Sequence, residues 1–246
     1  MNLSKTLATA GRVLRQLRHD RRTLALLFVV PPVLITILKY VFQGEARTFD
    51  SIAPMLLGIF PMTMMFLVTS IATLRERTSG TLDRLMTMPI AKIDFILGYA
   101  LAFSLVALAQ AVITAGVMLR VLDVSVMGGD FPAIIGGITA AFLGTSLGLF
   151  TSAFAATEFQ AVQFLPAFIF PQLLTCGLFV AREQMAKVLQ WFSDIMPLTY
   201  SVDAMKQITT HSVWTATLSK DLIIVVSFGV AALVLGSITI RRQEKA

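Results

Sequence analysis

Charged residues are scarce in this sequence. Asp, Glu, Lys and Arg make up 14% of its 246 residues, whereas hydrophobic residues make up 56%. A soluble domain carries about 25% charged residues, so this chain has too little polar surface to cover a soluble core of its size. The composition excludes an ordinary soluble enzyme. It also excludes a disordered chain, because disorder requires low hydrophobicity together with high net charge.

Residues that support catalysis or metal binding are few. The single cysteine, Cys176, lies in an apolar run, which excludes an intrachain disulfide and a cysteine-based metal site. The two histidines, His19 and His211, lie too far apart in sequence to indicate a metal cluster. No lysine follows a glycine, so the chain has no phosphate-binding loop of the G-x-x-x-x-G-K-[ST] type. We therefore expect no metal and no cofactor on this chain; ATP and Mg²⁺, if used, belong to a partner.

Ionisable residues are also missing from the centres of the apolar runs. Lys39 lies inside one, near enough to its end to reach the membrane surface, which disfavours a proton-coupled pump. Residues Gly144 to Gly148 match G-x-S-x-G, the pattern of a hydrolase nucleophile. Neither histidine is expected to reach Ser146 and serve as its base. We expect no catalytic residue, and an intramembrane hydrolase is the weakest interpretation.

Long apolar runs dominate what is present. A bilayer core of about 30 Å requires about 20 helical residues to cross it. The sequence therefore predicts an all-α membrane protein with six transmembrane helices, and an even number of spans places both termini on one side. The stretches of sufficient length are Thr23–Phe42, Ile52–Leu74, Ile93–Leu119, Phe131–Ala155, Phe159–Val180 and Leu222–Ile240.

The basic residues predict the orientation. Thirteen of the 20 Lys and Arg residues fall in the N-terminal arm, the segment between spans two and three, and the C-terminal tail. By the positive-inside rule these parts face the cytoplasm. We expect a multi-pass protein of the cell membrane with both termini cytoplasmic. The net charge of +6 is then explained by topology, and we expect no nucleic-acid partner.

The chain divides into an arm, residues 1–22, and a six-span domain, residues 23–246. The arm favours an amphipathic helix on the membrane surface over a frayed tail, because five apolar residues share one face: Leu3, Leu7, Ala10, Leu14 and Leu17. The outer segment, residues 181–221, predicts helices that dip into the membrane before the last span, with a solvated loop as the alternative.

Two local patterns predict packing and helix ends. Span four carries small residues at every fourth position, which permits close approach of a neighbouring helix. Between spans four and five, Thr157 and Gln160 fit a capping box, so span five should begin near Glu158. The small residues of span four are Gly136, Ala140, Gly144, Gly148 and Ser152.

The segment between spans two and three carries the clearest functional pattern. Gly80 ends the preceding helix, Thr81 is suited to N-cap a short helix, Asp83 favours its positive end and Pro89 stops it. A short amphipathic helix below the membrane suits a groove on a partner protein. Its apolar side chains share one face: Leu82, Leu85 and Met86.

This segment resembles the cytoplasmic loop of the permease subunits of type 2 ABC exporters, the family of daunorubicin-resistance-type and O-antigen permeases. The family loop reads E-R-E-x-G-T-L-E-x-L-x-x-x-P; here one extra residue precedes Gly80, and Asp83 replaces the Glu that follows G-T-L. Gly98 matches a usual glycine of span three, and Tyr99 stands where the family often has Lys. The family's motif before the last span is also present, as Pro197, Leu198, Thr199 and Tyr200.

The resemblance implies a transport subunit without bond chemistry of its own. It implies a permease homodimer that binds two copies of an ABC ATPase subunit, which would carry ATP and Mg²⁺. Contact with the ATPase is expected from the loop and the residue before it: Glu76, Gly80, Thr81, Leu82, Asp83, Leu85, Met86 and Pro89.

The resemblance also places the substrate pathway along spans two and five, with lipid contact or bundle packing as the alternative for each residue. The apolar character of these residues favours a hydrophobic or amphipathic substrate, such as a drug, antibiotic or lipid. A polysaccharide or glycolipid exporter of the same family is the alternative, and an ATP-independent channel or scaffold is a more distant one. The expected pathway residues are Phe60, Met64, Met65, Phe164, Phe168, Gln172 and Thr175.

Overall fold

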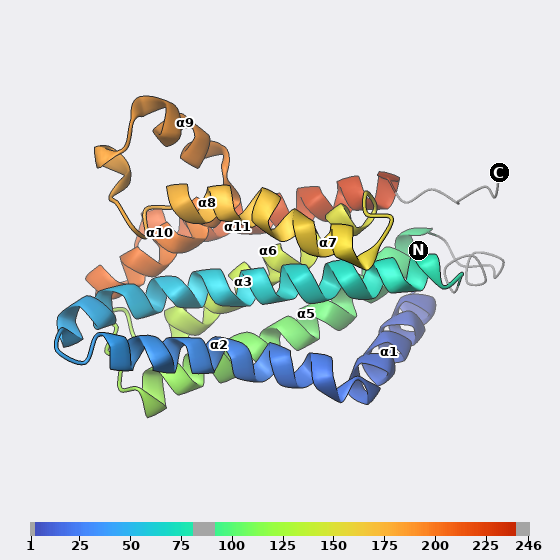
Figure 1. Cartoon of the computed structure of the whole chain (residues 1–246), viewed down its shortest axis with the longest axis horizontal. Helices are drawn as coiled ribbons and strands as arrows, with labels where there is room; N and C mark the ends of the chain where they lie inside the picture. The colour runs from blue at the N-terminus through green and yellow to red at the C-terminus, as the bar shows by residue number, and fades with distance from the viewer. Residues whose placement is uncertain (1–2, 81–91, 240–246) are drawn as a thin grey trace.

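The computed structural model describes residues 3–80 and 92–239. Within these ranges the chain is helical and contains no strand, and Figure 1 shows its long helices running lengthwise in an elongated bundle. The predicted all-α class is confirmed. The predicted coupling helix, Thr81 to Met88, and Pro89 behind it lie outside the described residues.

The helices follow one another with short connections. The long helices have few interruptions. Among the shorter elements of the described chain, two are π-helical turns and one is a 3₁₀ turn. The bounds of the elements are α1 Leu3–His19, α2 Arg21–Val41, α3 Ala46–Thr78, α5 Lys92–Gly116, η1 Val117–Val121, α6 Asp130–Ser152, α7 Glu158–Phe164, η2 Leu165–Ile169, α8 Phe170–Thr175, η3 Arg182–Gln184, α9 Lys187–Ile195, α10 Pro197–Thr210 and α11 Ala216–Thr239.

Five helical stretches of the described chain are long and apolar enough to cross a membrane. They are α2, α3, the run of α5 and η1 from Ile96 to Val121, α6 and α11. Each coincides with one of the predicted spans, so the chain is a multi-pass membrane protein. The remaining predicted span, 159–180, has a different form.

That remaining span is interrupted by a π-helical turn. α7, η2 and α8 follow one another from Glu158 to Thr175, with Pro166 inside η2 and Pro171 at the start of α8. A proline lacks the N–H that an α-helix needs for its i→i−4 bond, and a wider π turn accommodates that loss. The helix stops at Thr175, before the predicted end at Val180, and Gly177 has a φ of 84°. The count of six spans stays a prediction.

α3 and α6 pack backbone against backbone. A Cβ atom on Gly144 would lie 2.0 Å from the carbonyl oxygen of Met62, and one on Gly148 would lie 2.5 Å from that of Phe66. No side chain fits at either position without moving a helix. The small residues of predicted span four are therefore confirmed as a packing surface: Gly144 and Gly148 face α3, and Gly136 faces Met205 of α10.

α1 crosses the end of the bundle and packs against α5 (Figure 1). A Cβ atom on Gly98 of α5 would lie 2.6 Å from the Cβ of Thr9. Leu3 and Leu7 are 67% and 52% exposed, whereas Ala10 and Leu17 are buried, so only part of the apolar face predicted for the arm packs against the bundle. The residues of α1 that are buried are Thr6, Thr9, Ala10, Val13 and Leu17.

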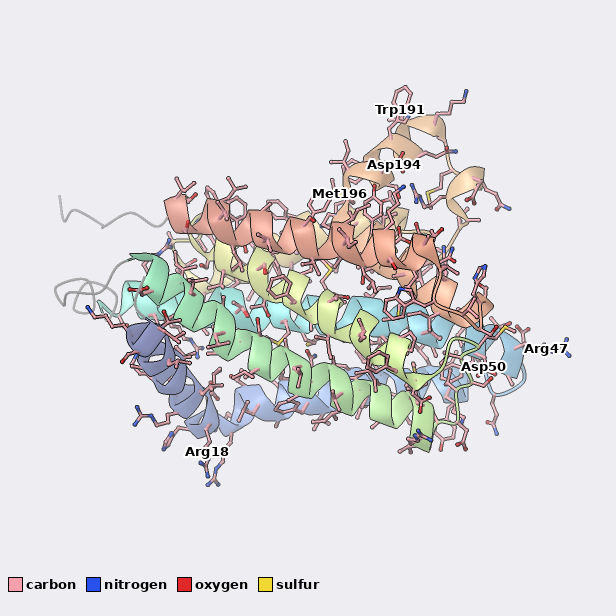
Figure 2. All side chains as sticks on the ribbon, turned by 180° about the vertical axis from the view of Figure 1, so that it is seen from behind. Arg18, Arg47, Asp50, Trp191, Asp194 and Met196 are labelled. Carbon is pink, nitrogen blue, oxygen red and sulfur yellow. The ribbon has the colours of Figure 1, made fainter. Side chains whose placement is uncertain are left out.

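The outer segment forms two helices, as predicted. α10 packs against α3, where the Ser201 hydroxyl donates to the Gly58 carbonyl at 3.2 Å. α9 stands away from the bundle with Trp191 on its exposed side (Figures 1 and 2). The break between them falls at Met196, directly before Pro197, the first residue of α10.

Candidate functional site

A buried ionic joint ties three helices together at the α1 end of the bundle. Arg12 of α1 donates from Nη1 to both carboxylate oxygens of Glu76, at 3.0 and 3.2 Å. Its Nη2 donates to the Tyr99 hydroxyl at 2.6 Å, and its guanidinium carbon lies 5.7 Å from the centre of the Tyr99 ring. Glu76 is 5% exposed. We call these three residues the arginine joint.

The joint lies between the two helices that flank the undescribed segment 81–91. Glu76 sits in the last turn of α3, just before that segment, and Tyr99 sits in the second turn of α5, just after it. Arg12 comes from the arginine-bearing side of α1. A charge-assisted hydrogen bond is stronger than a neutral one, and burial shields it from water. Displacement of one flanking helix is therefore resisted by the other and by α1.

A second, more exposed ionic contact lies beside the joint. Arg75 donates from Nε and Nη2 to the two oxygens of Glu158, at 2.7 and 2.9 Å, and its Nη1 lies 4.0 Å from Asp20 Oδ2. The hydrogen bond from Arg75 lowers the pKa of the Glu158 carboxyl. Asp20 N-caps α2 by accepting from the Thr23 hydroxyl and N–H, and the hydroxyl bond is the main cause of a lowered Asp20 pKa.

The turn after α6 is held by a third arginine. Arg77 donates to the carbonyl oxygens of Ala153, at 2.7 Å, and Ala155. Directly afterwards Thr157 accepts from Gln160 N–H at 3.2 Å, while the Gln160 side chain accepts from the Ala156 N–H at 2.8 Å. The predicted capping box is confirmed at Thr157, with its return bond one residue earlier than the standard pattern.

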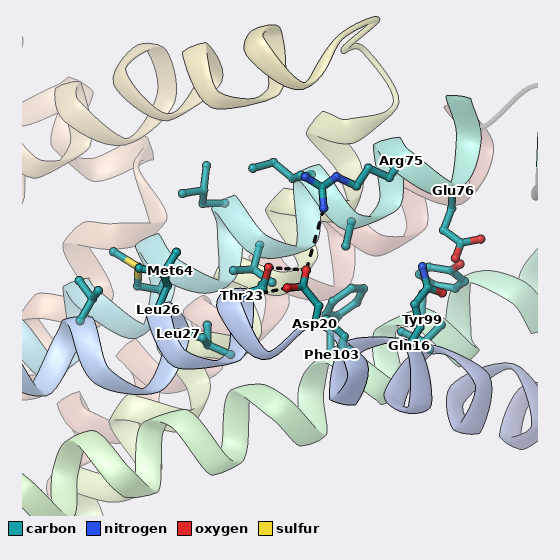
Figure 3. Close-up of a pocket in the computed structure, with 17 residues that line it drawn as sticks. Gln16, Asp20, Thr23, Leu26, Leu27, Met64, Arg75, Glu76, Tyr99 and Phe103 are labelled. Atoms are coloured by element: carbon teal, nitrogen blue, oxygen red, sulfur yellow. Dashed lines mark hydrogen bonds and ion pairs between the residues drawn. The ribbon is translucent and has the colours of Figure 1, made fainter. Parts of the chain in front are cut away.

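A cavity of about 340 Å³ lies between α2 and α3, next to Asp20, Arg75 and Glu76. Figure 3 shows Asp20, Arg75 and Glu76 at one end and Leu26, with its neighbours, along the walls. The cavity is apolar along most of its length and polar at the end where α1 joins α2.

The Pro-Leu-Thr-Tyr motif holds the other end of the bundle. The side-chain oxygen of Gln172 accepts from the Leu198 N–H at 3.3 Å, so α8 caps the start of α10. The Ser193 hydroxyl lies 3.0 Å from that of Thr199 and donates to the Thr175 carbonyl at 2.9 Å. The Tyr200 hydroxyl donates to the Asp194 carbonyl at 2.6 Å. The motif therefore joins α8, α9 and α10.

A partly buried ion pair accompanies the motif. Arg182 donates to Asp203 at 2.8 Å and also pairs with Asp194, while Lys206 Nζ lies 3.8 Å from Asp203. Burial raises the pKa of Asp203 in spite of these cations. The outer helices are thus fixed to one another by charge as well as by the motif.

Comparison with known proteins identifies the chain. The family model of ABC-2 type transporters matches residues 5–209. The chain belongs to the ABC-2 type transporter family. The family resemblance inferred from the loop and the Pro-Leu-Thr-Tyr motif is confirmed, and the structure gives the motif its place.

Curated relatives in this family are transport proteins. The chain is 28% identical to the probable multidrug ABC transporter permease YbhR of Escherichia coli K12, over 64% of this chain and 43% of that protein. It is 28% identical to the inner membrane transport permease YhhJ, over 60% and 40%. It is 25% identical to the ABC transporter G family member 20 of Dictyostelium discoideum, over 69% and 23%. The matches span less than half the length of each relative.

In this ABC-2 chain, the predicted coupling residues divide into two groups. Glu76 and Gly80 are described: Glu76 belongs to the arginine joint, and Gly80 has a φ of 73° directly after α3, as expected of a helix-ending glycine. The remaining members lie outside the described residues: Thr81, Leu82, Asp83, Leu85, Met86 and Pro89. Their contact with an ATPase stays a prediction.

The predicted pathway residues occupy different environments. Met64 lines the cavity, whereas Met65 is fully buried. Phe168 is exposed and stacks edge-on against Phe164, with ring centres 5.9 Å apart. The two polar members form hydrogen bonds within the chain. Gln172 bonds to the backbone of Leu198 and Phe168, and Thr175 bonds to the backbone of Pro171. Phe60 is half-buried beside the core. That these residues line a pathway stays a prediction.

The serine of the G-x-S-x-G match is a structural residue. Ser146 lies in the middle of α6, is fully buried, and donates to the Phe142 carbonyl at 2.9 Å. A nucleophile elbow requires a sharp turn between a strand and a helix, and the helix around Ser146 runs on from Asp130 to Ser152. The pattern arises here from the small residues that contact α3.

Sequence reasoning missed the arginine joint and the cavity. Arg12 and Glu76 lie 64 positions apart, and Arg12 and Tyr99 lie 87 apart, so no local spacing connects them. Three features of the sequence could together have indicated the joint. They are an acidic residue near the end of a span, an arginine-bearing arm, and a tyrosine where the family often has a lysine.

Proposed function

We propose that this chain is the permease subunit of an ATP-driven exporter that moves a hydrophobic or amphipathic compound out of the cell. A separate ABC ATPase subunit supplies the energy, and this chain performs no bond chemistry. The observation that carries the proposal is the family match over residues 5–209 together with the arginine joint, which ties the two ends of the predicted coupling segment to the bundle.

The coupling step follows from the position of the joint. In this proposal the ATPase holds the short helix around Leu82 and Leu85 in a groove and moves it when ATP binds. α3 and α5 carry that segment between them, and Arg12 links Glu76 of α3 to Tyr99 of α5. Movement of the coupling helix is therefore transmitted to α3, α5 and α1 together. A ligand shifts such an equilibrium only through its different affinity for the two states.

Pairing of two permease copies provides the pathway. Two identical chains bring two copies of the α7 to α8 run together, with exposed aromatic side chains such as Phe168 and Phe170 available to face the substrate. An aromatic lining suits apolar compounds. One relative is named a probable multidrug permease, which agrees with a drug-like substrate. The cytoplasm lies at the α1 end in this proposal, because the basic residues concentrate there.

The direct test is ATP-dependent efflux with a bound ATPase. The chain is co-expressed with candidate ATPase subunits encoded beside it, purified in detergent, and reconstituted to measure efflux of a fluorescent amphipathic dye. We expect wild-type chain to retain an ATPase and to export the dye only with ATP. Leu82→Asp should abolish both copurification and efflux, because it places a charge on the predicted apolar coupling face.

The matched control is Val213→Asp, an equally drastic change at an exposed position between α10 and α11. It should leave copurification and efflux near wild type. A wild-type chain that retains no ATPase and shows no ATP-dependent efflux contradicts the proposal. Ion conductance by the purified chain without ATP would favour a channel instead.

A further inference from the structure

The cavity between α2 and α3 is amphipathic along its length. At its polar end lie Gln16, Asp20, Thr23, Arg75 and Glu76. The walls beyond this end are apolar and include Leu26, Leu27, Val30, Met64, Leu67 and Val68. Its volume of about 340 Å³ lies in the range of small-molecule sites, about 300 to 1,000 Å³.

The cavity has the depth of one membrane leaflet. On α2 the lining runs from Asp20 to Val30, and on α3 it runs from Arg75 back to Met64. At 1.5 Å per residue both walls are about 15 Å long, which is half of a bilayer core of about 30 Å. The polar end coincides with the start of α2, where the membrane-crossing stretch begins. Polar and apolar parts therefore match the headgroup and tail regions of a leaflet.

At the polar end a guanidinium and a carboxylate face each other as an ion pair without a hydrogen bond between them. Arg75 uses Nε and Nη2 for Glu158, which leaves Nη1 directed at Asp20 from 4.0 Å (Figure 3). That separation is too long for a hydrogen bond. Each Asp20 oxygen accepts one bond from Thr23, and a carboxylate oxygen has room for a second. A head with one negative and one positive group can lie beside this pair, with its negative group toward Arg75 Nη1 and its positive group toward the Asp20 carboxylate.

An opening toward the bilayer is present at the wall. Leu26 is 61% exposed although it lines the cavity, so the side of the cavity formed by α2 meets the surroundings of the bundle. A molecule already in the membrane can enter there without crossing water.

We propose that this cavity binds one membrane phospholipid with a zwitterionic head. The phosphate contacts Arg75 Nη1, the amine contacts the Asp20 carboxylate, and one acyl chain lies between α2 and α3 along Leu26, Val30 and Val68. The inference needs the bundle to lie in a membrane but needs neither an ATPase nor transport. Its failure therefore leaves the proposed function standing, and the reverse also holds.

The test is native mass spectrometry of the full chain in detergent, titrated with lyso-phosphatidylethanolamine. We expect one molecule to bind the wild type with saturation. Val68→Trp fills the tail region and should weaken binding about tenfold or more. Asp20→Asn keeps a good N-cap but removes the charge, and should weaken binding about three- to tenfold. Val33→Trp, on α2 but outside the cavity, should bind as the wild type does.

Two further probes separate head from tail. Phosphoethanolamine alone and a long-chain alcohol alone should each bind at least about tenfold more weakly than the whole lipid. Equal binding of the alcohol would overturn the head assignment, and equal binding of phosphoethanolamine would overturn the phospholipid assignment. Equal affinity of the wild type and both cavity variants would show lipid held nonspecifically around the bundle. Leu26→Trp, at the exposed edge, repeats the filling test if Val68→Trp does not fold.

Discussion

Two helix pairs in this bundle run side by side over most of their length and pack in opposite ways. α3 meets α6 through glycines that leave no room for a Cβ atom, and 61% of the apolar stretch of each helix is buried. α2 meets α3 across the cavity, and 22% of its apolar stretch is buried. The α3–α6 seam therefore has one arrangement, because packed backbones are not continuously deformable.

The α2 flank packs against the bundle through few buried side chains, Leu27, Pro31, Pro32 and Ile35, and through polar contacts near its ends. At one end Asp20 faces Arg75, and at the other Lys39 Nζ donates to the Leu122 carbonyl at 2.6 Å. An exposed ion pair such as Asp20 with Arg75 contributes little. The comparison indicates that α3 and α6 move as one body, whereas α2 is the helix free to shift.

The largest effect is expected in the seam. Gly144→Ala places a Cβ atom 2.0 Å from the Met62 carbonyl oxygen, so α6 must separate from α3. We expect a loss of about 3 kcal/mol of unfolding free energy, seen as a clear fall in Tm of the purified protein.

Gly116→Ala is the matched control, because a Cβ atom there meets nothing within 4 Å. It should be neutral or stabilising by up to about 1 kcal/mol, since alanine favours helix more than glycine does. Equal effects of the two variants would contradict the tight seam.

The next largest effect is expected from Leu→Ala, made once in the α3–α6 pair and once in the α2–α3 pair. Leu143 of α6 is fully buried, whereas Leu26 of α2 is largely exposed. Leu143→Ala should cost about 2 kcal/mol or more, because it leaves a void in packed surroundings. Leu26→Ala should cost less than about 1 kcal/mol, because it enlarges a space that already exists. Chemical denaturation of both variants in one detergent measures the difference, and a larger loss for Leu26→Ala would reverse the comparison.

Features that depend on residues close together in the sequence could be predicted from it. Small residues every fourth position predicted the seam, because i and i+4 share a helix face. The Thr157 cap was predictable because an N-cap side chain and the N3 backbone that it bonds lie only three residues apart. The packed face of α1 was only partly predictable, because Gly98 leaves a notch on α5 that accepts Thr6 and Thr9, residues that an apolar pattern passes over.

Features that depend on the register of separate helices were beyond the sequence pattern. The arginine joint needs α1, α3 and α5 to place Arg12, Glu76 and Tyr99 at one depth. The cavity needs α2 to stand off from α3. Pro166 and Pro171 favour a break in the predicted span 159–180, but their spacing does not specify that the break takes the form of a π turn.

A moderate effect is expected at the arginine joint. Arg12→Ala and Glu76→Ala each leave a partly or fully buried polar partner behind. The double variant should therefore be less damaging than the sum, with a coupling energy of about 1 to 2 kcal/mol. A double-mutant cycle of unfolding free energies measures this quantity, and strict additivity would mean that the joint contributes nothing as a unit.

The smallest effect is expected from pH at the α2 flank. The folded pKa values of Glu158 and Asp20 lie below their ordinary values, and an unfolded carboxyl titrates near pH 4, as about 3.9 to 4.3 is usual. Their stabilising contribution is therefore complete above about pH 5 and is lost as pH falls through the folded pKa values. Glu158→Gln should flatten the fall of Tm between about pH 5 and 3, and an unchanged profile would contradict the assignment.

The contrast between seam and flank is tested most directly by distances between spin labels during ATP turnover. In the proposed complex with an ABC ATPase subunit, one label pair at Arg47 and Phe131 spans α3 and α6, and a second at Leu26 and Phe154 spans α2 and the turn after α6. With ATP trapped on the ATPase, double electron–electron resonance should show an unchanged distance for the first pair and a shifted distribution for the second. A shift in the α3–α6 pair with a constant α2 pair would contradict the account.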